Sequence, residues 1–353
     1  MSAYLHAIGT AVPTHDVHDA FIDWARGQVE PRHARLFDRM AARAGIHHRW
    51  SVLPAAPDGG SPVALGGFYN GGQPGTAERM RVYAEAAPAL ALDAIERLRE
   101  QVLLDDLTHI VVASCTGFVA PGVDQIIAAR LGLSPKVERL LVGFMGCYAA
   151  VAALRSARHI VRSDPTARVL VVTVELCTLH LQGVSEIEPL LAMLQFGDGA
   201  AAALVCAEPE GFALGQPFAA ALPDSGHLIR WDITDTGFAM HLSGEVPGRI
   251  AAALADQALA QAMTGGAEPQ AVDGWAVHAG GRSILDAVEN TLQLDAQALQ
   301  HSRAVLADYG NMSSATLMFV LRRLLAGPPV ERGVALAFGP GLAAEGFVFR
   351  STT

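Results

Sequence analysis

Cysteine and positive charge are both scarce in this sequence, and each scarcity excludes a class of protein. The 353 residues include four cysteines with no paired spacing, so neither a disulfide framework nor a zinc site is expected. The net charge is −10, from 25 Lys and Arg against 35 Asp and Glu. Because no broad basic face can form, a nucleic-acid partner is not expected, although a local patch could still bind a small anionic substrate.

Long apolar runs are missing as well. No stretch approaches the roughly 20 residues of a membrane-spanning helix, and the opening MSAYLHAIGTAVP lacks the regions of a secretory signal. With 51% hydrophobic and 17% charged residues, the chain can bury one large core or two fused ones. These observations predict a soluble cytoplasmic globular protein without a membrane span.

Strand and helix patterns alternate along the chain. The sequence predicts strands at 4–9, 110–113, 168–174, 200–206, 274–277, 333–338 and 346–349. It predicts helices at 17–27, 32–44, 77–100, 123–131, 246–264, 283–291 and 315–325, and a Gly- and Pro-rich surface loop at 51–76. The repetition indicates two similar α/β halves, 1–207 carrying a candidate cysteine and 208–353, packed against each other.

Cys147 stands between an apolar run and a long Ala-rich helical pattern that ends at Asp164-Pro165. A thiol at the start of a helix lies beside the positive end of the helix dipole, which favours the thiolate and a neighbouring oxyanion. Most free cysteines, however, are small core residues. This stretch alone therefore leaves a nucleophile and a buried core residue about equally open.

His278 and Asn311 occur in the same kind of place, between an apolar segment and a following helix. Sites in open α/β folds gather beyond the strand ends, so these residues and Cys147 could converge. An imidazole beside the sulfur would favour attack on a carbonyl, and His and Asn could both donate hydrogen bonds to a developing oxyanion. A core histidine or a helix-capping asparagine would give the same pattern.

Five segments occur in order over nearly the whole chain: GFMGCYAAVAAL, FGDGAAAALV, WAVHAGG, YGNMSSAT and AFGPGL. Together with IGTAVP and SCTGFVAPGVD, they resemble the type III polyketide synthases, the chalcone-synthase-like members of the thiolase superfamily. The resemblance implies a five-layered αβαβα thiolase-like α/β fold and a homodimer. It also implies iterative decarboxylative condensation of malonyl-CoA onto an acyl-CoA starter, followed by cyclisation to a pyrone, resorcinol or related aromatic polyketide, without a metal or other cofactor.

The resemblance also implies roles for individual residues. Cys147 would hold the starter and the growing chain as thioesters, His278 would keep Cys147 ionised, and His278 and Asn311 would stabilise the enolate left when malonyl-CoA loses carbon dioxide. The expected substrate contacts are Phe196 and Met240 as gatekeepers, Cys115 and His180 in the pocket, Gly339, Pro340 and Gly341 behind the cysteine, and Arg39 and Arg43 on the CoA phosphates.

Some of these positions depart from the family pattern or allow a plainer interpretation. Met240 stands where the second gatekeeper is a phenylalanine, and its flexible thioether would make the passage more adaptable. Cys115 is either a pocket residue or a silent buried thiol. Arg39 and Arg43 share a helix face with Arg35, a stripe that is common on solvated helices.

Substrate class and reaction remain open at this point. SCTGFVAPGVD and FMGC look closest to bacterial members that extend long-chain acyl starters. A ketoacyl-ACP synthase III-like condensing enzyme would share the fold and the Cys/His/Asn set. A Cys/His thioester hydrolase would release free acid without consuming malonyl-CoA, whereas an inactive homologue should have lost one of the three polar residues.

Overall fold

The computed structural model describes residues 2–352, which form one nine-stranded mixed sheet with helices around it. Its strand order is β11-β12-β13-β8-β1-β7-β6-β4-β5. The strands are β1 (Ala3–Ala11), β4 (His109–Ser114), β5 (Glu138–Gly143), β6 (Val169–Leu176), β7 (Asp198–Cys206), β8 (Phe212–Ala221), β11 (Gly274–Val277), β12 (Gly333–Gly339) and β13 (Ala343–Ser351). Every residue of β6 and β7 is buried, because helices cover both faces of the sheet there.

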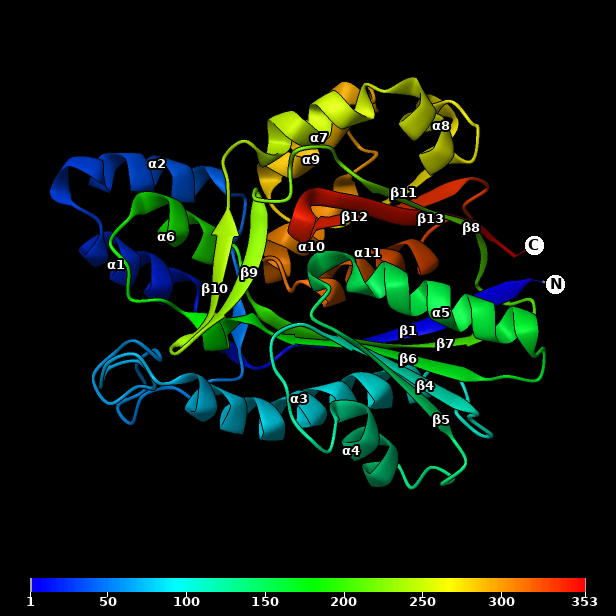
Figure 1. Cartoon of the computed structure of the whole chain (residues 1–353), viewed down its shortest axis with the longest axis horizontal. Coiled ribbons are helices and arrows are strands. Elements are labelled where there is room, and N and C mark those ends of the chain that lie inside the picture. Colours follow the sequence, from blue (N-terminus) through cyan, green and yellow to red (C-terminus); the bar gives the residue numbers. More distant parts are fainter. Residues whose placement is uncertain (1, 353) are drawn as a thin grey trace.

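Figure 1 shows five layers stacked on one another. The outer helices are α3 (Thr76–Arg99) and α4 (Val123–Arg130) below, and α7 (Val246–Leu254), α8 (Gln257–Thr264) and α9 (Arg282–Thr291) above. Between them, α5 (Ala149–Ser163) and α11 (Ser314–Leu325) contact β6 and β7 on one side and β12 on the other. The predicted αβαβα architecture is confirmed.

Small side chains allow the central layer to fit. Residues Ala149 to Leu154 of α5 are all buried, and all of them except Val151 and Leu154 are alanines. A helix with alanines around its circumference can approach two sheets closely, and burial on all sides explains its Ala-rich pattern. The Cys147 turn at the start of α5 is thereby placed deep in the molecule.

The two predicted halves meet in the sheet, where β1 pairs with β8 at Ala3 to Leu5. The boundary near residue 207 stays a prediction. The helix predicted at 246–264 is wrong, since the chain breaks it into α7 and α8. Asp256 makes the break, because its carboxylate accepts hydrogen bonds from the N–H groups of Ala258 and Leu259 and caps α8.

Helix α10 (Gln300–Tyr309) packs against α11 and α9. The other elements gather at the end of the layers away from the two termini, at the left of Figure 1. They are β2 (His15–Asp16), α1 (His18–Gln28), α2 (Ala34–Arg43), β3 (Trp50–Ser51), α6 (Ile187–Met193), and the β9 (Ile229–Thr234) and β10 (Gly237–Leu242) hairpin. As predicted, residues 52–75 contain no helix or strand. None of the helices within residues 2–352 combines the length and the apolar character needed to cross a membrane.

Candidate active site

A strained turn presents Cys147 at the head of α5. After β5 the backbone passes through positive φ at Phe144 (φ 56) and at Gly146 (φ 72). A Cβ on Gly146 would lie 2.4 Å from Cδ of Pro340, so only glycine fits. On the other side of the turn, a Cβ on Gly339 would lie 3.3 Å from the Cys147 nitrogen. Gly339 and Pro340 therefore pack against the Cys147 turn.

Asn311 lies beside Cys147 with its amide orientation fixed. Its Oδ1 accepts the Ser313 N–H at 2.8 Å and its Nδ2 donates to the Gly280 carbonyl at 3.2 Å. Hydrogen bonds from Ser313 and Asn311 to the sulfur act to lower the pKa of Cys147. Ser313 has φ 47 and was not expected in the site. The only sequence signal for Ser313 was its position two residues after Asn311 in YGNMSSAT.

His278 follows β11 and is 1% exposed. A Cβ on Gly280 would lie 3.4 Å from its Nε2, so His278 and Asn311 flank the same glycine. Within the described residues, neither ring nitrogen has a hydrogen-bond partner. Leaving a buried polar group unpaired costs about 1–3 kcal/mol, and both nitrogens are thus available to a ligand.

Burial acts on Cys147 and His278 in opposite directions. It raises the pKa of Cys147 to about 12, against the lowering by Ser313 and Asn311. It lowers the pKa of His278 to about 3. In both groups desolvation favours the neutral form. The predicted ionisation of Cys147 by His278 stays a prediction.

A buried acid supports the site from β6. Glu175 accepts hydrogen bonds from the Cys115 N–H at 3.0 Å and from the hydroxyl groups of Thr116, at 2.9 Å, and Ser314. Burial raises its pKa to about 7, although these hydrogen bonds act to lower it. The sequence analysis missed Glu175, yet a lone acid within the apolar strand VLVVTVEL was a usable signal.

Cys115 is 4% exposed and lies between Glu175 and Ser313. Its Sγ is 3.1 Å from the Ser313 Oγ and 3.4 Å from a Glu175 oxygen. Burial and the Glu175 charge raise the pKa of the Cys115 thiol well above its usual value. Cys115 touches residues around Cys147 but not the cavity described next, so its role as a pocket residue stays a prediction.

Phe196 lies between Asn311 and a cavity of about 80 Å³. Its backbone pairs with that of Asn311, and it lines the cavity together with Met240 and His180. Their role as substrate contacts stays a prediction. Most of the other lining residues are apolar; they include Val17, Phe21, Leu53, Val63, Leu181, Pro189, Met193 and Trp231. Cys147, His278 and Asn311 do not line this cavity, and Asn311 borders it through its pairing with Phe196.

His180 forms a fixed wall of this cavity. Its Nε2 donates to the Thr116 carbonyl at 2.7 Å, and its Nδ1 accepts the Phe238 N–H at 3.0 Å. The ring stacks on Phe238 at 4.2 Å, and burial lowers its pKa to about 3. Trp231 packs against it edge-on and donates to the Cys115 carbonyl at 2.9 Å. The sequence analysis did not single out Trp231.

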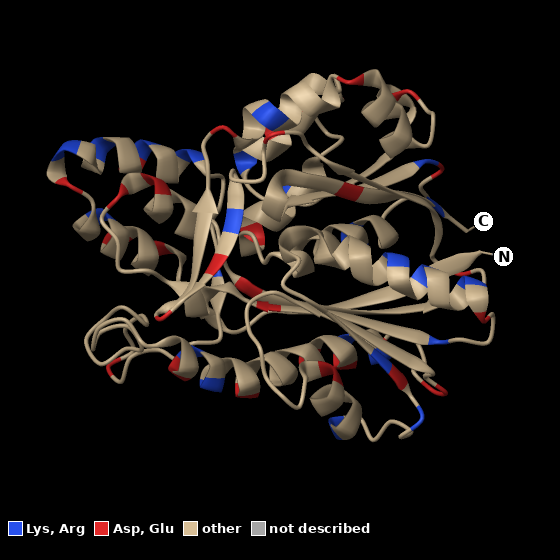
Figure 2. Ribbon diagram, in the orientation of Figure 1, with Lys and Arg blue, Asp and Glu red and all other residues tan. Residues whose placement is uncertain are grey.

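Arg39 and Arg43 lie apart from this cavity. Both are exposed on α2, whose basic residues appear at the upper left of Figure 2, and neither lines the cavity. Met40, between them, is 46% exposed. The structure leaves these arginines free for solvent or a ligand, and their assignment to CoA stays a prediction.

Known proteins of one family resemble this chain over nearly its whole length. The family description "Chalcone and stilbene synthases, N-terminal domain" matches residues 1–209, and the corresponding C-terminal domain matches residues 214–353. The "Alpha-pyrone synthesis polyketide synthase-like Pks18" of Mycobacterium tuberculosis is 34% identical, over 77% of this chain and 72% of that protein. Bisdemethoxycurcumin synthase of Oryza sativa is 33% identical, over 98% and 92%. The crystal structure of PKS-I from the brown alga Ectocarpus siliculosus superposes with a TM-score of 0.89, at 28% identity, over 99% and 98%.

Proposed function

The chain belongs to the chalcone and stilbene synthase family of type III polyketide synthases, and from this membership we propose how its own residues act and which starter it takes. Cys147 is the nucleophile, His278 is its base, and His278 and Asn311 together stabilise the enolate. The observation that carries the proposal is that Asn311 contacts both sides of the site: it donates to the Cys147 sulfur and to the carbonyl of Gly280, beside which the unpartnered Nε2 of His278 lies.

Acyl transfer begins with the neutral thiol. Cys147 Sγ attacks the carbonyl carbon of the acyl-CoA thioester while its proton passes to a His278 nitrogen. The carbon–sulfur bond to CoA then breaks, and the CoA thiolate leaves with that proton. The product is an acyl thioester on Cys147 with His278 neutral again, which is the form that its lowered pKa favours.

Malonyl-CoA then loses carbon dioxide, and the electron pair of the broken bond forms an enolate. Asn311 Nδ2 and an N–H of His278 donate hydrogen bonds to the enolate oxygen, in a site where burial strengthens them. The Asn311 amide is already held in the required orientation by Ser313. The enolate carbon attacks the acyl carbonyl, and the bond to Cys147 breaks. The Cys147 thiolate takes up a proton from solvent, and the lengthened chain becomes a CoA thioester for another cycle.

The starter is a long-chain acyl-CoA, and the product is an α-pyrone or a resorcinol. Two features support this choice: Met240 rather than an aromatic residue on the cavity wall, and a relative whose name includes alpha-pyrone synthesis. Arg39 and Arg43 bind the CoA phosphates from α2. A ketoacyl-ACP synthase or a thioester hydrolase finds no specific support in the geometry.

A homodimer forms through the outer edge of β5. This strand ends the sheet, and Leu140 and Leu141 are each 43% exposed although consecutive residues point to opposite faces. An exposed apolar edge strand is a pairing site. Leu141→Asp should halve the mass measured by light scattering, whereas Leu103→Asp, at a more exposed leucine away from this edge, should leave it unchanged. A monomeric unmodified chain would contradict this proposal.

Mass spectrometry tests the reaction. Purified protein is incubated with malonyl-CoA and either no starter or short, aromatic or long-chain acyl-CoA starters, with Cys147→Ala alongside. Long-chain pyrones or resorcinols that require Cys147 would support the proposal. Preference for a short or aromatic starter would overturn the starter but not the mechanism. Free acid alone, or condensation only with malonyl-carrier protein, would overturn the mechanism.

A further inference from the structure

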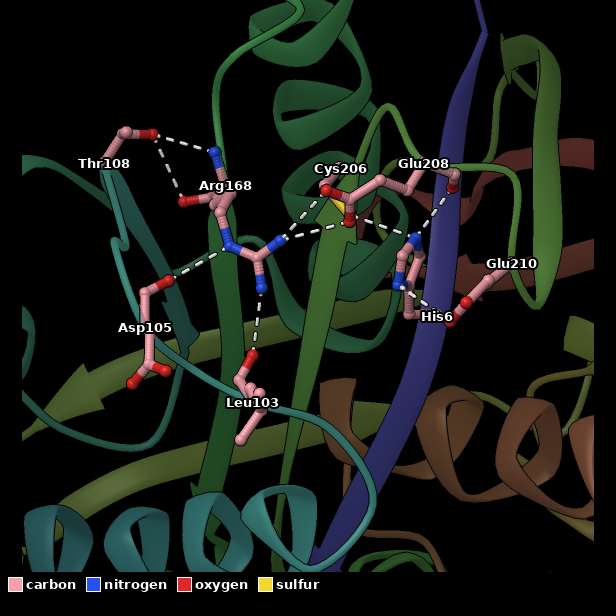
Figure 3. A network of polar contacts seen from close by, with 8 residues as sticks. All are labelled: His6, Leu103, Asp105, Thr108, Arg168, Cys206, Glu208 and Glu210. Carbon is pink, nitrogen blue, oxygen red and sulfur yellow. Dashed lines mark hydrogen bonds and ion pairs between the residues drawn. The ribbon is translucent and has the colours of Figure 1, made fainter.

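Three side chains with different donor atoms meet at the end of the sheet opposite Cys147, in the cluster shown in Figure 3. His6 Nε2 lies 3.0 Å from the Sγ of Cys206, the last residue of β7, and a carboxylate oxygen of Glu208 lies 3.4 Å from the same sulfur. One ligand atom of each residue falls within 4.8 Å of the others. Imidazole, thiolate and carboxylate are the ligand types that Zn²⁺ takes in proteins.

Two further side chains hold these groups in place. Nε2 is the ring nitrogen that faces the thiol, and a Glu210 oxygen lies 3.7 Å from Nδ1 on the other side of the ring. Arg168 pairs with the Glu208 carboxylate at 3.1 Å, and Arg168 is itself fixed by the Leu103 carbonyl at 2.9 Å. Figure 3 shows these two partners on opposite sides of the cluster. Carboxylate–histidine pairs and a hydrogen-bonded ligating carboxylate are regular features of metal centres.

We propose that His6, Cys206 and Glu208 bind a divalent transition-metal ion of the zinc type. Zn–S and Zn–N bonds of about 2.3 and 2.0 Å in a tetrahedral site place sulfur and nitrogen about 3.5 Å apart. The groups therefore move by roughly half an ångström to admit the ion. The Cys206 thiol proton is released to solvent, and Nε2 exchanges its 2.8 Å contact with the Glu208 carbonyl for the metal.

The position of the cluster assigns the ion a structural task. β7 begins at Asp198 beside the active site and reaches Cys206 roughly 26 Å further on, at about 3.3 Å per residue. The ion would join β1 to β7 and to the connection that enters β8, where the two halves of the chain meet. The Glu208 side chain is 64% exposed, which gives the ion a path from solvent.

Cobalt(II), a spectroscopic substitute for zinc, tests the site. The full-length protein is freed of metal with chelator and titrated with Co²⁺, and thiolate-to-cobalt charge-transfer absorption is recorded. We expect one equivalent bound per chain, displaced by Zn²⁺, with the absorption lost in Cys206→Ser. Glu210→Gln should weaken binding about 10- to 100-fold, because it removes the group that orients His6.

Two control variants distinguish this cluster from the chain's remaining histidines and thiols. His109→Ala removes a histidine on β4 that also lies 3.7 Å from a glutamate but has no thiol partner, and it should bind Co²⁺ as the unmodified protein does. Cys147→Ala should keep the absorption as well. Loss of the absorption in Cys147→Ala would place the ion in the active site and overturn the proposal. So would unchanged binding in Cys206→Ser, or no stoichiometric binding.

Discussion

Gly146→Ala should damage both stability and acylation, because the new methyl group would enter the turn that holds Cys147. The added Cβ would lie 2.4 Å from Cδ and 2.6 Å from Cγ of Pro340, far inside van der Waals contact. Gly341 provides a matched control, since its φ of 75 is close to the φ of 72 at Gly146 but a Cβ there meets no atom within 4 Å.

The two substitutions separate backbone strain from steric overlap. Either alanine in the left-handed region costs about 1–2 kcal/mol. Overpacking at Gly146 adds about 1–3 kcal/mol. Urea unfolding should therefore place Gly146→Ala about 1–3 kcal/mol below Gly341→Ala in free energy of unfolding. If relief of the overlap moves the Cys147 sulfur by about 1 Å, self-acylation should slow by roughly 100-fold.

Self-acylation can be followed by intact-protein mass spectrometry with a long-chain acyl-CoA and no malonyl-CoA. Equal stability and equal acylation in the two variants would refute the reasoning, because the overlap with Pro340 would then have no consequence. A stability difference without an acylation difference would show that the turn yields away from the sulfur.

Four other substitutions, at three positions, test separate parts of the site. Cys147→Ala should abolish polyketide formation, whereas Cys147→Gln should keep malonyl-CoA decarboxylation, measured as released carbon dioxide, because His278 and Asn311 remain; loss of decarboxylation in Cys147→Gln would count against that division of roles. Met240→Phe should narrow the range of starters accepted, measured as product per starter, and an unchanged profile would remove Met240 from the passage. The pKa of Glu175 is raised from 4.5 to about 7, so the folded state holds a proton that the unfolded state loses, and stability falls as pH rises from 4.5 to 7. The side chain in Glu175→Gln does not titrate. The free energy of unfolding of this variant, minus that of the unmodified protein, should therefore rise by about 3 kcal/mol between about pH 4 and about pH 8. A difference in urea unfolding that does not change with pH would contradict this.

Local patterns in the sequence were sufficient for most of the layers. The apolar runs of β6 and β7 and the Ala-rich pattern of α5 indicated buried elements, and the observed bounds lie close to the predicted ones. Strand β8 was not predicted from the sequence. Its segment FALGQPFAAA contains a glycine and a proline, which weaken a strand pattern. Pairing with β1 and β13 makes this segment a strand, and such long-range pairing leaves no local signal.

Some residues of the candidate site could likewise be predicted from local sequence, and others could not. Cys147, His278 and Asn311 could be proposed because each stands at the junction between an apolar segment and a helix, and family resemblance then joined them. Ser313 and Glu175 act through hydrogen bonds with residues far away in the sequence, which spacing does not reveal. The His6 and Cys206 cluster is the extreme case, because 200 residues separate two side chains that lie 3.0 Å apart.

Burial shifts Cys147 and His278 in opposite directions, and this favours one order of events in the proposed reaction. A thiolate–imidazolium pair would place two charges in a site that removes their hydration, a cost that their attraction offsets only with good geometry and further hydrogen bonds. Among residues 2–352, neither His278 nitrogen has a hydrogen-bond partner that would stabilise an imidazolium. If the proton instead leaves Cys147 while its sulfur bonds to the acyl carbonyl, negative charge passes directly to an oxygen that Asn311 can meet. The resting site then stays neutral, and charge appears only when an acyl-CoA thioester has entered past Phe196.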